Sequence, residues 1–261
     1  MTAPDGSLPP AAARVREFYD EVWTRYLQDQ EAARSHLGEI FPAELVRDRR
    51  ALDAGCGGGA FARALAESGA RFVCGLDLSL GSLGTARRVN SAANAAHVCG
   101  TMDRLPFRDG GFEIVWAWGS VEHTVHPWAA LAELDRALAP GGRLMVALYK
   151  RTGLTRLHGV MRAALSSLPR RTHAPMSRAL AWVLAPVVRL FQRREKMRAG
   201  ERLAGLVHDW FFVPVRHHFD PAEVRAWLVA RGYAEELFIP STARFESSSH
   251  FILRMRKAGG A

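Results

Sequence analysis

Short apolar segments alternate with helical segments along most of the chain, and this alternation constrains the fold more than any other feature. Strand-like runs cover residues 50–54, 72–76, 96–99, 112–116 and 144–148, and segments with helical spacing of apolar residues separate most of them. Apolar strands joined by helices form a parallel sheet that is covered on both faces. The pattern therefore predicts an α/β protein with a mostly parallel sheet.

Two closing strands and four regions complete the expected organisation. Strands are expected over residues 233–239 and 250–255, which brings the sheet to seven strands. The length of 261 residues suits one main core with additions. The expected regions are a helical cover at residues 1–40, a ligand-binding core at 41–150, a helical lid insert at 151–204 and a segment that completes the core sheet at 205–261.

A cluster of glycines follows the first expected strand. Four glycines lie within residues 53–60, between that strand and a helical segment. Glycine lets a backbone turn sharply and approach a ligand closely, and the N-terminus of the following helix offers N–H groups to it. Asp77 ends the next strand, where a carboxylate accepts hydrogen bonds from both hydroxyls of a ribose. Together these features predict a site for a nucleoside cofactor.

The glycines alone leave the identity of the cofactor open. Gly55, Gly57 and Ala60 also satisfy the dinucleotide pattern G-x-G-x-x-G/A. Asp53 disfavours NAD, because its carboxylate would repel a pyrophosphate, and it suits a ligand that carries an amino group. An NAD-dependent oxidoreductase remains an alternative on these residues.

Five ordered segments resemble the class I methyltransferases that depend on S-adenosylmethionine (SAM), in their small-molecule branch. The matching segments are DAGCGGG at residues 53–59, GLDLS at 75–79, LPFRDGGFEIV at 105–115, VEH at 121–123 and LAPGG at 138–142. The resemblance implies a Rossmann-like fold, SAM as the cofactor and methyl transfer to a small molecule. It also implies a place in specialised metabolism, in natural product biosynthesis.

The resemblance further implies which residues bind the cofactor. Asp53 and the glycine turn would hold the methionine end of SAM, Asp77 would hold the ribose, and Leu78 would lie against the adenine. The expected cofactor-binding residues are Tyr19, Asp53, Gly55, Cys56, Gly57, Gly59, Asp77, Leu78, Thr101, Met102, Asp103 and Trp118.

Residues 100–104 depart from the commonest pattern of the family. Thr101 stands where the acceptor for the adenine amine usually lies, and a threonine hydroxyl is able to accept that bond. Met102 would give the adenine an apolar contact, and Asp103 would reach its edge. Tyr19 is expected to cover the cofactor from an N-terminal helix, and Trp118 is expected to shape the pocket.

Candidate catalytic residues follow the fourth strand. Methyl transfer needs an aligned nucleophile, and a general base helps where the acceptor must lose a proton. His123 is expected to be that base or a wall of the cofactor pocket, and Glu122 to be a base or to orient a neighbour. His123 and His126 also form an H-x-x-H pair, but no carboxylates at ligand spacing accompany them, so no metal site is expected.

Residues toward the acceptor are expected both after that strand and beyond the lid insert. His126, His208, Trp210 and His217 are the candidates, and ordinary packing is the alternative for each of them. The acceptor itself is not identified by these residue types.

The positive charge of the chain is concentrated in the insert. The formal net charge is +9, yet residues 150–202 hold thirteen Lys and Arg against two acidic residues, and the remainder holds 22 against 24. Three interpretations remain open: a solvated lid over an apolar small molecule, a lid that recognises an anionic group or an acidic carrier protein, and a basic amphipathic segment that meets a membrane and a lipid-like acceptor. Nucleic acid is disfavoured, because aromatic residues do not interleave with the basic run.

Several classes of protein are disfavoured by composition. Cys56, Cys74 and Cys99 form no C-x-x-C pair, so neither a thiolate zinc site nor a disulfide framework is expected. The first ten residues lack the features of a signal peptide, and no apolar run reaches the roughly 20 residues that span a bilayer. We therefore expect a cytoplasmic protein without a transmembrane segment, and the oligomeric state stays open.

The expected function is SAM-dependent methylation of oxygen or nitrogen on a small molecule. Three alternatives remain: a SAM-binding protein that transfers no methyl group, with a regulatory or other catalytic role; a C-methyltransferase for a lipid- or quinone-type acceptor; and the NAD-dependent oxidoreductase.

Overall fold

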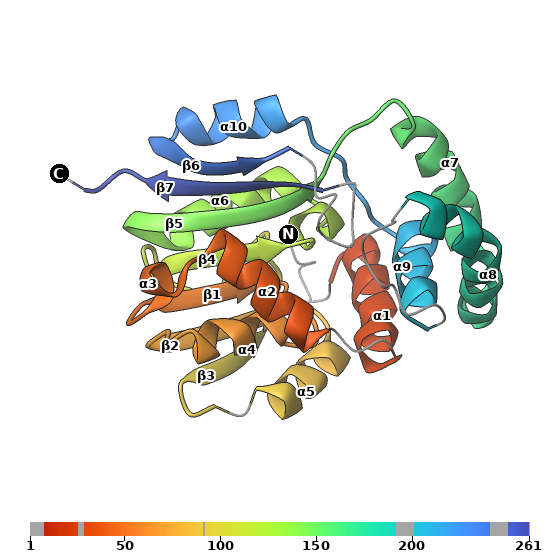
Figure 1. Cartoon of the computed structure of the whole chain (residues 1–261), viewed down its shortest axis with the longest axis horizontal. Helices are drawn as coiled ribbons and strands as arrows, with labels where there is room; N and C mark the ends of the chain where they lie inside the picture. Colours follow the sequence, from red (N-terminus) through yellow and green to blue (C-terminus); the bar gives the residue numbers. More distant parts are fainter. Residues whose placement is uncertain (1–7, 26–28, 91, 192–200, 241–249, 261) are drawn as a thin grey trace. The chain divides into compact units, whose positions relative to one another are not determined.

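The computed structural model describes residues 8–25, 29–90, 92–191, 201–240 and 250–260. The described chain divides into two compact units, a larger one of residues 1–151 and 215–261 and a smaller one of Thr152–Pro214. The larger unit holds the whole sheet, and the smaller one is helical (Figure 1).

The larger unit is built on one seven-stranded sheet, as the strand pattern predicts. The strand order is β3-β2-β1-β4-β5-β7-β6. Strands β1 to β5 pair in parallel, whereas β7 is antiparallel to both β5 and β6. The strands are β1 (Arg50–Ala54), β2 (Phe72–Asp77), β3 (Ala95–Cys99), β4 (Phe112–Trp118), β5 (Leu138–Tyr149), β6 (Tyr233–Ile239) and β7 (His250–Lys257).

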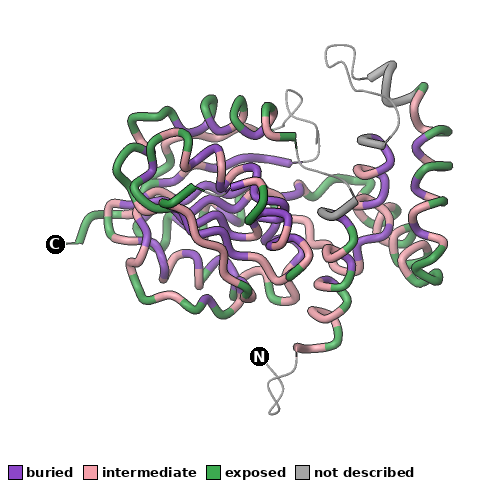
Figure 2. Tube along the Cα trace, turned by 90° about the horizontal axis from the view of Figure 1, so that it is seen from below, coloured by how far each residue is buried: buried purple, intermediate pink, exposed green. Residues whose placement is uncertain are grey.

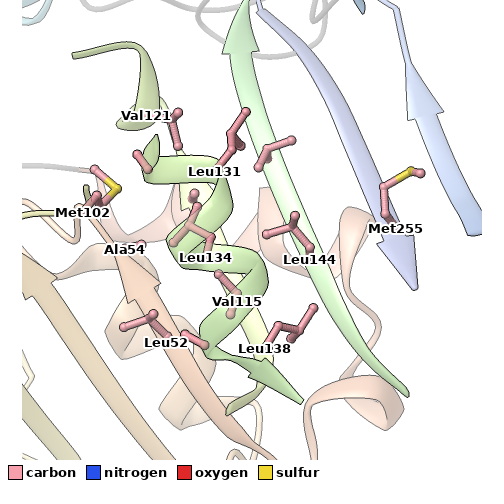
Figure 3. Close-up of a cluster of buried hydrophobic side chains, with 14 of the residues drawn as sticks. Leu52, Ala54, Met102, Val115, Val121, Leu131, Leu134, Leu138, Leu144 and Met255 are labelled. Atoms are coloured by element: carbon pink, nitrogen blue, oxygen red, sulfur yellow. The ribbon is translucent and has the colours of Figure 1, made fainter. Parts of the chain in front are cut away.

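Helices cover both faces of this sheet, which confirms the expected Rossmann-like architecture. Residues of α2, α3 and α4 share one buried apolar cluster with β1, β4 and β5. Residues of α6 and α10 share a second cluster on the other face, where Leu131 and Leu134 of α6 lie close to Val115 and Leu144 of the strands (Figure 3). The helices of this unit are α1 (Pro10–Arg25), α2 (Gln30–Ile40), α3 (Ala43–Val46), α4 (Ala60–Glu67), α5 (Leu80–Val89), the 3₁₀-helix η1 (Val121–His123), α6 (Pro127–Ala137) and α10 (Pro221–Val229).

Strand β5 is longer than the sequence pattern predicts. The expected strand covers residues 144–148, whereas β5 begins at Leu138 and includes the Pro140–Gly142 turn-like segment. The pairing of β4 with β5 shifts register between Phe112 and Ile114, and this irregularity accommodates the additional residues. The tube in Figure 2 is buried along most of these central strands.

The smaller unit consists of α7 (Thr155–Ser166), the 3₁₀-helix η2 (Arg170–Thr172), α8 (His173–Phe191) and α9 (Glu201–Phe212). Helix α9 packs against both α7 and α8. The insert therefore extends to Pro214 and does not end at residue 204 as expected. The physical reason is that buried residues such as Val207 and Phe212 continue the apolar face of α9 beyond that boundary.

Candidate active site

The glycine turn after β1 forms one wall of a polar site at the carboxyl edge of the sheet. Gly55, Gly57 and Gly59 have φ values of 78°, 52° and 85°, a region that favours glycine. The backbone N–H groups of Gly55 and Cys56 both donate to the carbonyl of Leu76, at 2.7 and 2.9 Å, which ties the turn to β2. The turn therefore has a fixed shape.

Gly55 has no space for a side chain. A Cβ atom there would lie 2.4 Å from Cβ of Ser120, whose hydroxyl donates to the carbonyl of Ala54 at 2.7 Å. We expect Gly55→Ala to lower the free energy of unfolding by about 2–4 kcal/mol, through strain at positive φ and this overlap. Gly38→Ala is the matched control, because Gly38 lies in α2 with nothing within 4 Å of an added Cβ. Urea denaturation should show that the control is stabilised by about 0.5–1 kcal/mol; equal stability of the two variants would contradict the prediction.

Asp77, at the end of β2, organises the second part of the site. Its Oδ2 accepts the Gly57 N–H at 2.9 Å and its Oδ1 accepts the Ser79 N–H at 2.8 Å. Burial raises the pKa of Asp77 to about 6, although these two hydrogen bonds favour the ionised form. A carboxylate offers about four acceptor positions, so Asp77 keeps acceptor capacity beyond the bonds to Gly57, Ser79 and Leu78.

Asp53 is the most deeply buried acid beside the glycine turn. Asp53 is only 2% exposed, and its Oδ2 has no hydrogen-bond partner among the described residues. Burial raises the pKa of Asp53 to about 8, and the charge of Asp77 adds to the shift. Leaving a buried acceptor without a partner costs free energy. A cationic group of a ligand would supply the partner that this oxygen lacks.

Stability without ligand should therefore fall as the pH rises. Between about pH 6 and about pH 8 the native protein holds a proton on Asp53 that the unfolded chain, with an ordinary carboxyl pKa, has lost. Because the native state binds more protons, raising the pH across this window should cost about 1–3 kcal/mol of unfolding free energy. Asp53→Asn should remove this part of the pH dependence in urea denaturation. A variant with the same slope as the native sequence would show that Asp53 ionises normally.

Thr101 offers a second acceptor without a described partner. Its Oγ1 is buried and has no hydrogen-bond partner among the described residues, and Thr101 forms an isolated bridge with Arg104. Met102 next to it is buried, and its terminal methyl lies 3.3 Å from the position of a Cβ on Gly55. Leu78 and Asp103 are partly buried. Of the expected adenine contacts, Met102 thus lies beside the turn.

Helix α1 is fastened to the same edge by Asp20. Its Oδ1 accepts from the Ser79 hydroxyl at 2.7 Å and from the Gly81 N–H at 3.0 Å, at the start of α5. The hydroxyl of Ser82 donates to the carbonyl of Tyr19 at 3.3 Å. These bonds hold Tyr19 close to the site, where its ring centroid lies 5.7 Å from that of His123.

His123 lies between two tyrosine rings. It ends η1 just after β4, is buried, and has its ring centroid 5.8 Å from that of Tyr149. Its Nδ1 lies 2.8 Å from the carbonyl of Val215. Because a carbonyl only accepts, Nδ1 carries the proton, and Nε2 of the neutral ring is then the nitrogen that can accept one.

Glu122 precedes His123 in the chain and contacts a second histidine, His250. Glu122 is fully buried, and its Oε1 lies 3.2 Å from Nε2 of His250. Its Oε2 has no hydrogen-bond partner among the described residues. The His250 ring stacks on Tyr149 with 4.1 Å between centroids. The guanidinium carbon of Arg216 lies 3.4 Å from the centroid of the same tyrosine. These residues form a compact cluster at the carboxyl edge of β4 and β5.

Three members of this cluster are missing from the residues expected from sequence: Tyr149, Arg216 and His250. They come from the end of β5, from the segment before α10 and from the start of β7. Because β7 runs antiparallel to β5, His250 pairs with Tyr149 and reaches the same edge. No local pattern marks these residues: strand pairing brings His250 to Tyr149, and the segment before α10 brings Arg216 to the same ring.

The larger unit holds three other expected residues: Trp118, His126 and His217. Trp118 lies parallel to Trp116 and His36, at 6.0 and 5.3 Å between centroids, so its ring packs among aromatic side chains on the α2 face. His126 is exposed at the N-terminus of α6. His217 lies near Glu122, to whose carbonyl its N–H donates at 2.8 Å.

His208 and Trp210 belong to α9 of the helical unit. His208 is buried there, and its Nδ1 lies 2.9 Å from the Ser177 hydroxyl of α8. Its ring also stacks on Phe212 at 5.5 Å between centroids. His208 therefore packs inside the unit, while Trp210 is partly buried on the same helix. Within the described part of the chain, no helix has the length and apolar composition needed to cross a membrane.

Comparisons with known proteins agree with this geometry. Residues 52–146 match the family model described as "Methyltransferase domain". The chain is 31% identical to the ubiquinone biosynthesis O-methyltransferase of Neisseria meningitidis serogroup C, over 62% of this chain and 71% of that protein. It is 30% identical to the protein of the same name from Nitrosococcus oceani, over 63% of this chain and 73% of the relative.

A solved structure supports the fold independently of these sequences. The magnesium protoporphyrin IX methyltransferase of Synechocystis with bound SAM superposes with a TM-score of 0.59 at 15% identity, over 96% of this chain and 99% of that one. At this identity the likeness concerns the fold.

Proposed function

The chain belongs to the class I SAM-dependent methyltransferases, and from this premise we propose that it transfers the methyl group of SAM to an oxygen atom of a small-molecule acceptor. One observation carries the proposal: two buried acceptor oxygens without described partners, on Asp53 and Thr101, belong to the same edge as Asp77 and the glycine turn. This arrangement suits a ligand with an ammonium group, a ribose and an adenine amine.

The residues present offer polar groups of the kinds that SAM needs. Asp53 would accept from the amino group, both oxygens of Asp77 would accept from the ribose hydroxyls, and Thr101 would accept from the adenine amine. Leu78 and Met102 supply apolar contacts, and Tyr19 covers the site from α1. When bound, SAM supplies an electrophilic methyl group, so the protein has to align the acceptor and exclude water.

The remaining backbone contacts follow from the shape of the turn. Gly55, Cys56, Gly57 and Gly59 are the residues that we assign to the methionine end of SAM, because the positive φ values of the three glycines give the turn its sharp bend. Asp103 and Trp118 are assigned to the cofactor site by the family resemblance alone. Asp103 is partly buried beside Met102, and the ring of Trp118 faces the α2 side of the sheet.

Deprotonation of the acceptor is assigned to His123. The Val215 carbonyl fixes the ring tautomer, so Nε2 is the nitrogen that receives the proton of an acceptor hydroxyl. Glu122 acts through His250, whose Nε2 it contacts, and so orients a neighbour of the reacting site. His126 and His217 remain the proposed acceptor contacts from the larger unit.

The relatives favour oxygen as the acceptor atom, because both are named O-methyltransferases. Their names refer to ubiquinone biosynthesis, so the expected place in specialised metabolism gains no support, and neither does an acidic carrier protein. The family assignment favours SAM over NAD. A SAM-binding protein without methyl transfer and a C-methyltransferase are the remaining alternatives.

Titration calorimetry with SAM and with NADH, followed by assays for S-adenosylhomocysteine with phenols, hydroxy acids and amines, tests the proposal. We expect binding of SAM only, and product formation with a hydroxyl-bearing acceptor. SAM binding without turnover of any acceptor would favour the non-methylating alternative, and preferential binding of NADH would contradict the assignment. Mass spectrometry of the product separates O- from C-methylation.

A further inference from the structure

The helical unit carries apolar side chains on its outer surface at helical spacing. In α7 and its N-cap these are Leu154, Leu157, Val160 and Met161, with exposed fractions of 70%, 59%, 70% and 44%. No described residue of α7 is buried. Scattered exposed apolar residues are ordinary, but residues that repeat every three or four positions form a continuous stripe. We call this stripe the α7 outer face.

Helix α8 shows a second stripe, the α8 outer face, formed by Pro175, Ala179, Trp182, Val183 and Pro186, all of which are exposed. Trp182 is 82% exposed and Val183 is 62% exposed. These positions follow one another at intervals of three or four residues and therefore share one side of the helix. Exposed stretches recur along α8 in Figure 2.

The opposite side of α8 already supplies the core of this unit. His173, Ser177 and Ala181 are buried there. The Ser177 hydroxyl lies 2.9 Å from Nδ1 of His208, and the ring of His173 lies 4.6 Å from that of Phe212, both in α9. The α8 outer face therefore takes no part in the packing of α8 on α9. That packing does not explain why the face is apolar.

Charge indicates the chemistry of the occupant. Residues 152–214 contain eleven Lys and Arg against three Asp and Glu, and no acidic residue occurs from residue 136 to residue 194. Arg171 and Arg178 are exposed beside the α8 outer face, and Arg156 is exposed beside Leu157 on α7. A helix with arginines flanking an apolar face that includes tryptophan is typical of segments that lie in the interface of an anionic bilayer.

We propose that the α7 and α8 outer faces bind the surface of a membrane that contains anionic lipids. The apolar stripes enter the boundary between headgroups and acyl chains, and the arginines contact lipid phosphates. Trp182 is the principal anchor, because it is the largest apolar side chain on either face. This inference concerns the helical unit by itself and does not depend on the identity of the methyl acceptor.

Vesicle sedimentation of the full chain tests the proposal. Vesicles of phosphatidylglycerol and phosphatidylcholine in equal parts should bind the protein at least about tenfold more tightly than vesicles of phosphatidylcholine alone. Raising NaCl to about 0.5 M should remove most of this preference. Equal binding to both vesicles, or no binding to either, would overturn the proposal.

Paired variants locate the surface. Trp182→Glu combined with Val183→Glu should weaken binding by about tenfold or more, because two charges would enter the apolar boundary. Val229→Glu is the matched control, because Val229 is 57% exposed on α10 of the other unit. Unchanged SAM affinity and circular dichroism would show that both variants fold. Equal effects of the two changes would overturn the assignment to α8.

A depth measurement separates a membrane from a protein partner. Brominated acyl chains should quench tryptophan fluorescence of the bound protein, and Trp182→Phe should bind but lose most of this quenching. Sedimentation velocity provides the competing outcome. A native dimer that Trp182→Glu converts to a monomer, without vesicle binding in either form, would assign the face to a second copy of the chain and overturn the proposal.

Discussion

Replacement of Asp77 by alanine is expected to weaken SAM binding by about a hundredfold or more. The carboxylate is proposed to accept hydrogen bonds from the ribose hydroxyls, and hydrogen bonds to a charged group contribute about 1.5–3 kcal/mol each. The same carboxylate holds the N–H groups of Gly57 and Ser79, so the substitution also loosens the glycine turn. Titration calorimetry measures the dissociation constant directly.

Two further variants separate these contributions of Asp77. Asp77→Asn keeps one oxygen acceptor and should lose less affinity than Asp77→Ala. Asp109→Asn is the matched control, because the side chain of Asp109 is 82% exposed and forms an ion pair with Arg136 at 2.7 Å. A dissociation constant for Asp77→Ala within about threefold of the native value would refute the ribose role.

His123→Ala should lower kcat by about 10²–10⁴, which is the usual contribution of a positioned general base. SAM affinity should stay within about threefold, because the proposed polar contacts to SAM come from Asp53 on β1, Asp77 on β2 and Thr101 after β3. A general base acts only in its unprotonated form, so the rate of the native enzyme should depend on pH. The variant should lose this dependence, and steady-state assays across pH with the acceptor found by the panel would measure it.

Rescue and a matched control distinguish a base from a wall of the pocket. Added imidazole should restore part of the rate of His123→Ala, since it can take the proton in the vacated space. His158→Ala should leave the pH profile unchanged, because the ring of His158 packs on Phe211 within the helical unit, with 5.3 Å between centroids. Loss of SAM affinity with an unchanged kcat would identify His123 as a wall.

The order of the elements could be read from local sequence. Strands such as β1 and β2 are apolar on both faces, and this composition predicts buried parallel strands. The glycine turn was also predictable, because clustered glycines are typical of a backbone with positive φ and close packing. Gly55 has both, and only a residue without a side chain fits there. Asp220 at the start of α10 accepts the Ala222 N–H at 2.9 Å, as an N-cap residue should.

The extent of β5 and of the helical insert could not be read in this way. Pro140–Gly142 is a common signal for a turn, yet pairing with β4 continues across it with a register shift. The segment after residue 204 joins the insert because α9 packs on α7 and α8, a contact between residues distant in sequence. Tertiary contacts overrode local preference in both places.

The sequence by itself determined the strand and helix pattern, the glycine turn and the two acids beside it, Asp53 and Asp77, because these depend on steric rules and periodicity among near neighbours. Only the tertiary structure decided that Glu122 contacts His250, 128 residues away in sequence, and that both lie beside Tyr149. It also decided that burial raises the pKa of Asp53 to about 8. The physical reason is the same in each case: strand pairing and desolvation depend on which distant segments meet, and no local pattern encodes that meeting.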